Sequence, residues 1–179
     1  MVTWASLLDE LTASLDAGGL DDPALDARRM VEAASGHDGT ALHEVLDADV
    51  GHRAMAALDR MQARRLRGEP LQYVVGSWGF RTLDLFVDRR VLIPRPETEI
   101  VAGLALDALD RAEATRPVVV DLGTGSGAIA LAVAVERPAS RVWGTDRSAA
   151  ALDVARPARP MPARLARATS SAAAERSVP

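Results

Sequence analysis

The chain has 179 residues, of which 48% are hydrophobic and 26% are charged, and its formal net charge is −4. This composition is typical of a globular protein of one domain or two small ones. The acidic balance argues against a general nucleic-acid-binding protein, because phosphate recognition needs a basic surface. The absence of cysteine excludes disulfides, thiolate catalysis and Cys-based zinc sites.

All 21 basic residues are arginines, and the chain contains neither Lys nor Asn. Schiff-base chemistry and any mechanism that needs an Asn side chain are therefore excluded. The three histidines, His37, His43 and His52, are too few and too scattered to predict a metal site. Residues 1–15 lack the basic region of a signal peptide, and the longest apolar run, 128–135, is far shorter than the ~20 residues of a membrane-spanning helix. We expect a cytoplasmic protein that does not contact a membrane.

Residues 1–74 predict a small helical bundle. Apolar residues recur at intervals of three and four from Trp4 to Leu15 and from Leu25 to Ala34, and two further helical segments follow up to Leu66. Glycine and proline separate these segments. Acidic residues outnumber arginines here. This excess indicates either a solvated surface or a docking face for a basic partner.

Residues 75–96 predict a β-hairpin linker, since the apolar residues between Trp78 and Val87 favour an extended pair. Residues 97–156 begin with a helix whose apolar face runs from Ile100 to Leu109. A strand, a glycine-rich turn, a helix, a second strand and another helix follow, which is the βαβ unit of an α/β fold.

The first of these strands, 118–122, is a continuous apolar run, and we expect it to be buried on both faces. Residues 157–179 mix Pro with Ala, Arg and Ser and have no sustained apolar face, so we predict a disordered tail.

The strongest motif in the chain is Asp-Leu-Gly-Thr-Gly-Ser-Gly, which lies between a predicted strand and a predicted helix. Glycines permit a tight turn and let a ligand approach the backbone, and a carboxylate at the end of the next strand can accept hydrogen bonds from a ribose diol. The candidate cofactor-binding residues are Asp121, Gly123, Thr124, Gly125, Ser126, Gly127 and Asp146.

Two classes of nucleotide fit the spacing of this motif. The glycines also match the dinucleotide fingerprint in its G/A form. The carboxylate of Asp121, however, would repel a pyrophosphate and suits S-adenosylmethionine, which carries an ammonium and a sulfonium and no phosphate. We favour S-adenosylmethionine over a nicotinamide or flavin nucleotide and over a glycine turn without a ligand.

With these residues in view, the chain resembles the HemK/PrmC-type N(5)-glutamine methyltransferases, which modify peptide chain release factors. The first stretch that carries the resemblance is Arg-Gly-Glu-Pro-Leu-Gln-Tyr-Val-Val-Gly at 67–76, with Trp-Gly-Phe at 78–80. The second is Val-Leu-Ile-Pro-Arg-Pro-Glu-Thr-Glu at 91–99, and the third is the glycine motif with Asp146. The resemblance covers about residues 4–156.

The resemblance implies that the helical bundle docks a class 1 release factor and that the linker leads into the first part of a class I, Rossmann-like methyltransferase domain. The loop at 123–127 would hold the methionine part of S-adenosylmethionine, and Asp146 its ribose. The substrate would be the Gln of a Gly-Gly-Gln motif, whose amide nitrogen attacks the methyl group. The substrate-side candidates are Arg95, Pro96, Glu97 and Thr98, although a salt bridge at a helix start explains Arg95 and Glu97 equally well.

The chain departs from the family at the catalytic motif Asn-Pro-Pro-Tyr, because it has no Asn and its single Tyr is Tyr73. We therefore predict no catalytic residue and interpret the chain as a C-terminally truncated or frameshifted, catalytically incomplete member. Two alternatives stay open. One is a non-catalytic fragment that binds a release factor or the cofactor, and the other is a lineage that methylates a glutamine of a ribosomal protein.

Overall fold

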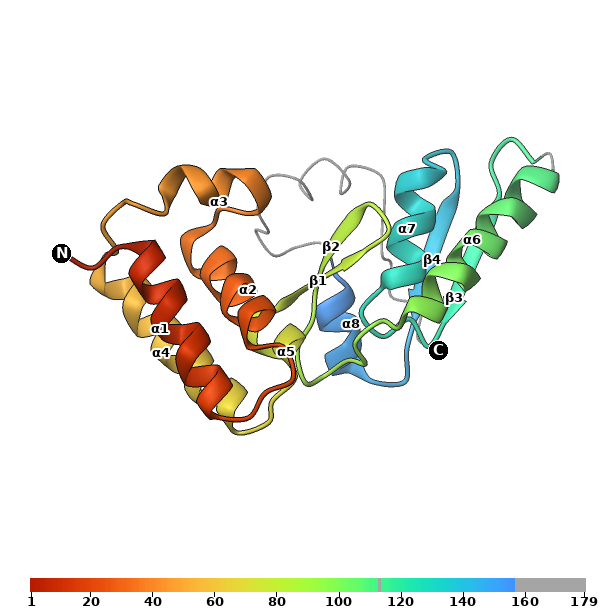
Figure 1. Ribbon diagram of the computed structural model, residues 1–179. Helices are drawn as coiled ribbons and strands as arrows, with labels where there is room; N and C mark the ends of the chain where they lie inside the picture. The colour runs from red at the N-terminus through yellow and green to blue at the C-terminus, as the bar shows by residue number, and fades with distance from the viewer. Residues whose placement is uncertain (113, 157–179) are drawn as a thin grey trace. The chain divides into compact units, whose positions relative to one another are not determined.

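The computed structural model of the chain describes residues 1–112 and 114–156 (Figure 1). They form two compact units, one of residues Met1–Val75 and a second that begins at Gly76. The tail that we predicted for residues 157–179 lies outside the described residues. None of the described helices combines the length and the apolarity that crossing a membrane requires.

The first unit is a helical bundle, which confirms the prediction for this part of the chain. Its helices are α1 (Trp4–Ala17), α2 (Pro23–Ser35), α3 (Gly39–Val45), α4 (His52–Leu66) and the short α5 (Leu71–Val75). The side chain of Asp22 accepts a hydrogen bond from the Leu25 amide and caps α2, which begins at Pro23 and is followed by Gly36 with a φ of 73°. The proline and the glycine that separate the predicted helical segments therefore stand at the two ends of this helix.

The core of the first unit is built entirely from its own residues. Helices α1 and α2 each contribute three of the buried residues, α5 contributes two, and α3 and α4 contribute one each. Leu15, Met30 and Val31 are completely buried. The whole cluster of buried residues is Trp4, Leu11, Leu15, Ala27, Met30, Val31, Leu42, Leu58, Leu71 and Val74. Because no residue beyond Val75 is needed to complete this cluster, we expect the unit to fold by itself.

Two consecutive arginines at the end of α4 hold the neighbouring helices. Arg64 donates to both carboxylate oxygens of Glu69, with Nε–Oε2 at 2.8 Å and Nη2–Oε1 at 2.6 Å, and also to the Tyr73 carbonyl in α5. The hydrogen bond to Glu69 raises the pKa of Arg64. Arg65 pairs with the buried Asp26 of α2 at 2.6 Å. The Glu of the Gly-Glu-Pro stretch, which carries part of the family resemblance, is therefore a buried structural residue.

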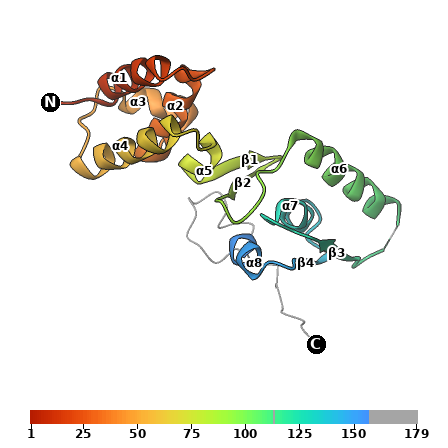
Figure 2. The same ribbon diagram turned by 90° about the horizontal axis from the view of Figure 1, so that it is seen from below.

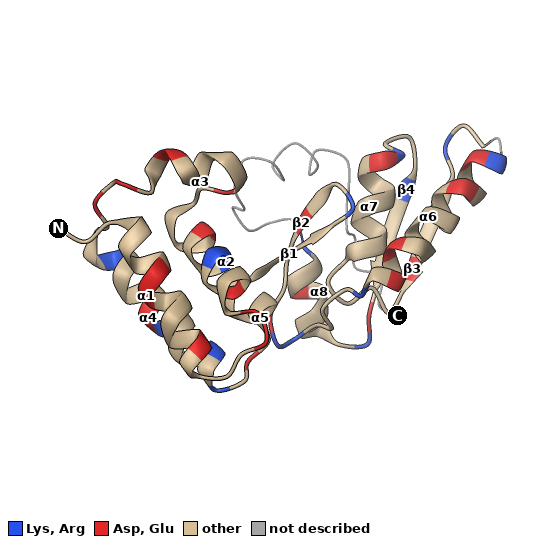
Figure 3. Cartoon of the chain, viewed as in Figure 1, with Lys and Arg blue, Asp and Glu red and all other residues tan. Residues whose placement is uncertain are grey.

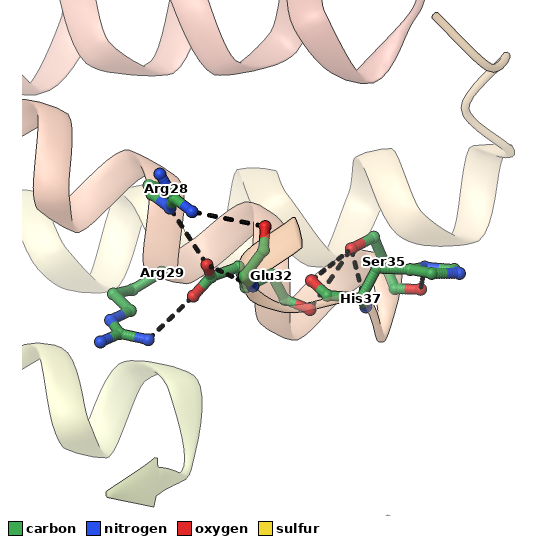
Figure 4. Close-up of polar contacts among 6 residues, drawn as sticks. Arg28, Arg29, Glu32, Ser35 and His37 are labelled. Carbon is green, nitrogen blue, oxygen red and sulfur yellow. Dashed lines mark hydrogen bonds and ion pairs between the residues drawn. The ribbon is translucent and has the colours of Figure 1, made fainter. Parts of the chain in front are cut away.

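A second cluster of ion pairs lies at the end of α2 (Figure 4). Glu32 is 9% exposed and accepts hydrogen bonds from Arg28, at 3.1 Å, and from Arg29, at 3.0 Å. One turn further along, the His37 ring nitrogen Nδ1 lies 2.9 Å from the Ser35 carbonyl oxygen. Burial of Glu32 is tolerated because both of its oxygens are paired with a guanidinium.

The second unit begins with the predicted hairpin and continues with the predicted βαβ unit. Strands β1 (Ser77–Phe80) and β2 (Leu83–Phe86) pair antiparallel, and helix α6 (Pro96–Arg111) follows. Strands β3 (Val118–Leu122) and β4 (Arg141–Thr145) then pair parallel, connected by α7 (Ala128–Glu136), and α8 (Ala149–Ala155) comes last. Both predictions of topology are confirmed.

The tip of the hairpin is attached to two helices by a single arginine. Arg81 has a φ of 53° and is, among the described residues, the one non-glycine residue with a positive φ. Its amide donates to Glu99 of α6 at 2.9 Å, and its guanidinium donates to both oxygens of Glu136 in α7, at 2.6 and 2.7 Å. The hydrogen bond from Arg81 lowers the pKa of Glu136. The left-handed backbone of Arg81 therefore lets this one residue connect the hairpin to both α6 and α7.

The prediction that strand 118–122 is buried on both faces is wrong for the described structure. Helix α7 packs against one face of β3 and β4 (Figure 2). On the other face Val118, Val120 and Leu122 are 61%, 53% and 81% exposed. The residues between them, Val119 and Asp121, are partly buried on the side of α7. Among the described residues no helix covers the second face, and this is why alternate residues of an apolar strand remain exposed.

Helix α6 also buries a different face from the one we expected. It packs mainly against α7, and its buried residues are Ala102 and Leu106. Ile100, Val101 and Leu104, which belong to the predicted apolar face, are exposed. The helix itself was predicted correctly, but its packing partner decides which side is buried.

Candidate cofactor-binding site

The glycine loop lies at the carboxyl end of β3 and begins α7. Gly123, Gly125 and Gly127 all have left-handed backbones, with φ of 77°, 54° and 83°. A Cβ at Gly123 would meet no atom within 4 Å, so this position needs glycine for its conformation and leaves the backbone open to a ligand. At Gly127 a Cβ would lie 3.2 Å from both the Ala155 and the Leu131 side chains. This glycine therefore also allows close packing of the loop against α8.

The loop is held by hydrogen bonds to the end of β4. The amides of Gly123 and Thr124 both donate to the Thr145 carbonyl, at 2.8 and 2.9 Å, and the Gly127 amide donates to the Thr124 carbonyl at 2.8 Å. Thr124 and Ser126 are buried, 7% and 5% exposed. These two predicted site residues therefore lie within the protein, whereas Gly123 is exposed and Gly125 is partly buried, so these two glycines are the more accessible part of the loop.

Asp121 caps the helix that follows the loop. Its Oδ2 accepts hydrogen bonds from the Thr124 hydroxyl at 2.8 Å and from the Ala130 amide at 3.2 Å. Ala130 is the third residue of α7, and Gly127, which precedes the helix, has no side chain with which to cap it. A carboxylate is favoured at this end of a helix by the dipole. The other oxygen, Oδ1, accepts no hydrogen bond from any described residue.

Asp146 is joined to the same loop. Its Oδ2 accepts a hydrogen bond from the Gly125 amide at 3.0 Å, and its Oδ1 accepts one from the Ser148 amide at 2.9 Å. These two backbone donors, with Ser148 the stronger, hold the pKa of Asp146 below its ordinary value, so the group is ionised at neutral pH. Each oxygen keeps a second lone pair, which a hydroxyl can still use. The structure thus brings together the two carboxylates and the loop that the sequence singled out.

The substrate-side candidates lie at the start of α6. The backbone carbonyl of Arg95 accepts the Thr98 amide at 2.9 Å, and Pro96 is the first helical residue. Arg95, Pro96 and Glu97 are exposed, and Thr98 is partly buried. In the described part of the chain, Arg95 and Glu97 form no ion pair, and no hydrogen bond joins these four residues to the loop. Proline at the first position and Glu97 in the first turn agree with a helix start.

Three residues that support the loop were not predicted. The Thr145 carbonyl anchors two loop amides, and the Ser148 amide holds Asp146. Gly144 lies against Thr124, because a Cβ there would be 3.0 Å from the Thr124 hydroxyl oxygen. Their common signal is the position next to Asp146 at the carboxyl end of a parallel strand, where ligands bind in α/β sheets. Within residues 1–112 and 114–156 no group of three or more metal-ligating side chains comes together.

Comparison with known proteins finds two family matches in this chain. Residues 6–76 match the PrmC N-terminal domain, and residues 98–175 match the methyltransferase small domain, which includes the loop and Asp146. Release factor glutamine methyltransferases from three bacteria are similar to it. The protein from Burkholderia pseudomallei is 48% identical over 142 residues, 79% of this chain and 48% of the relative.

The protein from Xylella fastidiosa is 54% identical over 105 residues, 57% of this chain and 38% of the relative. The protein from Streptomyces coelicolor is 43% identical over 143 residues, 80% of this chain and 50% of the relative. The chain thus spans about half the length, or less, of these curated relatives. The PrmC N-terminal domain matches almost all of the first unit, and the methyltransferase small domain matches residues of the second unit.

Proposed function

We propose that this chain, which belongs to the HemK/PrmC-type family of release factor glutamine methyltransferases, binds S-adenosylmethionine at the loop 121–127 and Asp146. The reaction that the family resemblance implies for this site is methylation of the glutamine side-chain amide in the Gly-Gly-Gln motif of class 1 peptide chain release factors. The observation that carries this proposal is the pair of carboxylates on the two sides of the glycine loop, one of which has an oxygen that no described residue contacts by a hydrogen bond.

The residues of the site fit the parts of this cofactor. The open backbone at Gly123 accepts the methionine part, and Oδ1 of Asp121 has no partner in the described structure and suits an ammonium group. Asp146 is held by the Gly125 and Ser148 amides and presents its remaining lone pairs to a ribose diol. When bound, S-adenosylmethionine supplies an electrophilic methyl group on its sulfonium. The protein contributes position and charge.

The capping role of Asp121 supports this cofactor over a dinucleotide. In a dinucleotide site, the pyrophosphate binds at the amides of the helix N-terminus. Here the Ala130 amide of α7 already donates to the Asp121 carboxylate, so a fixed negative charge stands at that position. Isothermal titration calorimetry of the full chain with S-adenosylmethionine and with NAD⁺ tests the proposal. We expect heat of binding with S-adenosylmethionine only. Binding of NAD⁺ in preference to it would overturn the assignment.

We propose that the first unit docks the release factor through its exposed carboxylates. The three buried carboxylates, Asp26, Glu32 and Glu69, are used in ion pairs with arginines. The exposed ones that we assign to the docking face lie on α1, α3 and the adjacent loops (Figure 3). They are Asp9, Glu10, Asp16, Asp21, Asp22, Glu44 and Asp47, and Asp38, Asp49 and Asp59 are exposed as well.

Charge reversal separates docking from a surface that is only solvated. A Glu44→Arg/Asp47→Arg variant of the full chain is expected to bind a class 1 release factor several-fold more weakly, and increasingly so at low salt. An Asp84→Arg variant, which makes a charge change of the same sign at an exposed position of the second unit, serves as the control. Unchanged binding by the double variant and by equivalent reversals at Asp9 and Glu10 would reject the docking role.

We assign Arg95, Pro96, Glu97 and Thr98 to the substrate side of the site, and the exposure of the first three supports this. An Arg95→Ala variant is expected to weaken binding of the release factor without changing the affinity for S-adenosylmethionine. Loss of affinity for S-adenosylmethionine alone would move Arg95 to the cofactor side.

One specific observation favours binding without turnover by these 179 residues. They contain no Asn, and the single Tyr, Tyr73, lies in the first unit, where its carbonyl binds Arg64. No Asn-Pro-Pro-Tyr motif is therefore present to hold the glutamine amide. Incubation of the chain with methyl-labelled S-adenosylmethionine and either a release factor or ribosomal proteins is expected to transfer no label. Label on the release factor would reject this view of the chain, and label on a ribosomal protein alone would reassign the substrate.

A further inference from the structure

Thr124 has the environment of a residue that works through another side chain. It is 7% exposed, and its hydroxyl donates to Oδ2 of Asp121 at 2.8 Å. The same oxygen accepts the Ala130 amide at 3.2 Å. Strand β3, the loop and α7 therefore meet at one carboxylate oxygen. Two donors on this oxygen fix the plane of the carboxylate, and the second oxygen, Oδ1, is left without a partner among the described residues.

Gly144 on the neighbouring strand provides the space in which Thr124 lies. A Cβ at this position would be 3.0 Å from the Thr124 hydroxyl oxygen and 3.2 and 3.3 Å from two of its carbon atoms. The φ of Gly144 is not in the left-handed region, so glycine is not needed there for the backbone. Its small size is what matters. A larger residue at this position would displace the Thr124 hydroxyl and so weaken its hydrogen bond to Asp121.

We propose that Thr124 is a positioning residue, whose hydroxyl holds Asp121 so that Oδ1 receives the amino-acid part of an S-adenosyl ligand, and that Gly144 preserves this arrangement. This inference rests on the proposed cofactor. A carboxylate that is already oriented loses less conformational freedom when the ligand binds, and the affinity rises accordingly. Without the hydroxyl, the Ala130 amide still caps on Oδ2, but the carboxylate can rotate about that single contact.

The test compares ligands with and without an amino-acid part. S-adenosylmethionine has both parts, whereas 5′-methylthioadenosine keeps only the adenosine part, which Asp146 is proposed to hold. In calorimetry on the full chain, Thr124→Val is expected to bind S-adenosylmethionine about tenfold more weakly, the effect of one hydrogen bond to a charged group. The same variant should bind 5′-methylthioadenosine within about twofold of wild type, a difference below the size of one hydrogen bond.

Two further variants separate positioning from a general effect on folding. Thr124→Ser keeps the hydroxyl and is expected to restore most of the affinity, whereas Gly144→Ala should reproduce the selective loss. Thr12→Val makes the same chemical change in α1, where the hydroxyl donates to the Leu8 carbonyl, and should change neither affinity. Melting temperatures of all variants show whether they are folded.

The inference is overturned if Thr124→Val binds S-adenosylmethionine as wild type does, or if it loses both ligands to the same degree while remaining folded. If Thr124→Val does not fold, the comparison is made between Gly144→Ala and Thr124→Ser. The positioning role requires Gly144→Ala to bind S-adenosylmethionine more weakly than Thr124→Ser does, and equal affinities of these two variants reject it. A wild-type chain that binds neither ligand rejects the proposed cofactor, and this inference with it. The failure of the two proposals is therefore distinguished by the wild-type titration.

Discussion

Replacement of Arg64 by Met tests whether the buried ion pair at the end of α4 stabilises the helical bundle. The change removes both hydrogen bonds to Glu69 and those to the Tyr73 and Val74 carbonyls, while it keeps the length of the side chain. The Glu69 side chain, 5% exposed, would remain buried while it loses both of these guanidinium hydrogen bonds. Loss of one partner of a buried pair costs about 3–5 kcal/mol.

This cost is reduced here because the Arg64 side chain is 37% exposed, so water partly screens the pair. We therefore expect a loss of about 2–3 kcal/mol in the free energy of unfolding. A bundle of this size has a total stability of about 4–11 kcal/mol, so the loss is a large fraction of it. The melting temperature should fall by about 10–20 °C.

The assay uses a fragment of residues 1–76, which we expect to fold because all residues of its core lie between Trp4 and Val74. Trp4 is the single Trp of this fragment and is 8% exposed, so its fluorescence reports unfolding in urea. Arg60→Met, one turn earlier on the exposed side of α4, is the matched control and should change stability by less than about 0.5 kcal/mol.

Equal stability of the Arg64→Met and Arg60→Met fragments would show that the ion pair contributes nothing. A wild-type fragment without a cooperative transition would contradict the independence of the first unit.

Three further predictions concern the second unit. Gly127→Ala should destabilise it by about 1–3 kcal/mol, because a left-handed alanine is strained and its Cβ would crowd Ala155. Gly125→Ala, where a Cβ would have no atom closer than 4.0 Å, should cost only the backbone strain. Equal losses of stability for the two variants in thermal denaturation would reject the packing argument. The hydrogen bond from Arg81 lowers the pKa of Glu136 below its ordinary value of 4.5. The ionised carboxylate therefore stabilises the folded unit at pH values above 4.5, and this contribution is lost as the pH falls through the lowered pKa of the folded state. Glu136→Gln should therefore lower the melting temperature at neutral pH and make it less sensitive to acid, and a wild-type acid dependence in this variant would contradict the assignment. Asp146→Asn should bind S-adenosylmethionine about tenfold more weakly in calorimetry, since a neutral acceptor replaces a charged one toward the ribose diol, and unchanged affinity would remove Asp146 from the site.

Much of the local structure could be predicted from the sequence, because it depends on neighbouring residues. Asp22 and Pro23 start α2, Gly36 ends it, and three glycines with positive φ form the loop before α7. The βαβ topology and the meeting of the loop with Asp146 follow from the order of elements, since parallel strands place their carboxyl ends at one edge of the sheet.

Burial and long-range partners could not be predicted in this way. The exposed face of β3 and the buried face of α6 depend on α7, which packs between them, and an apolar strand has the same sequence whether one face or both are covered. Likewise, no pattern in the sequence around Glu69 predicts that its carboxylate is paired with Arg64. The sequence by itself determined the helices, the hairpin, the glycine turn and its acid, because these arise from backbone preferences over a few residues. The tertiary structure alone decided which faces are buried and which oxygen of Asp121 receives the hydrogen bonds of Thr124 and Ala130, because both depend on contacts between separate elements.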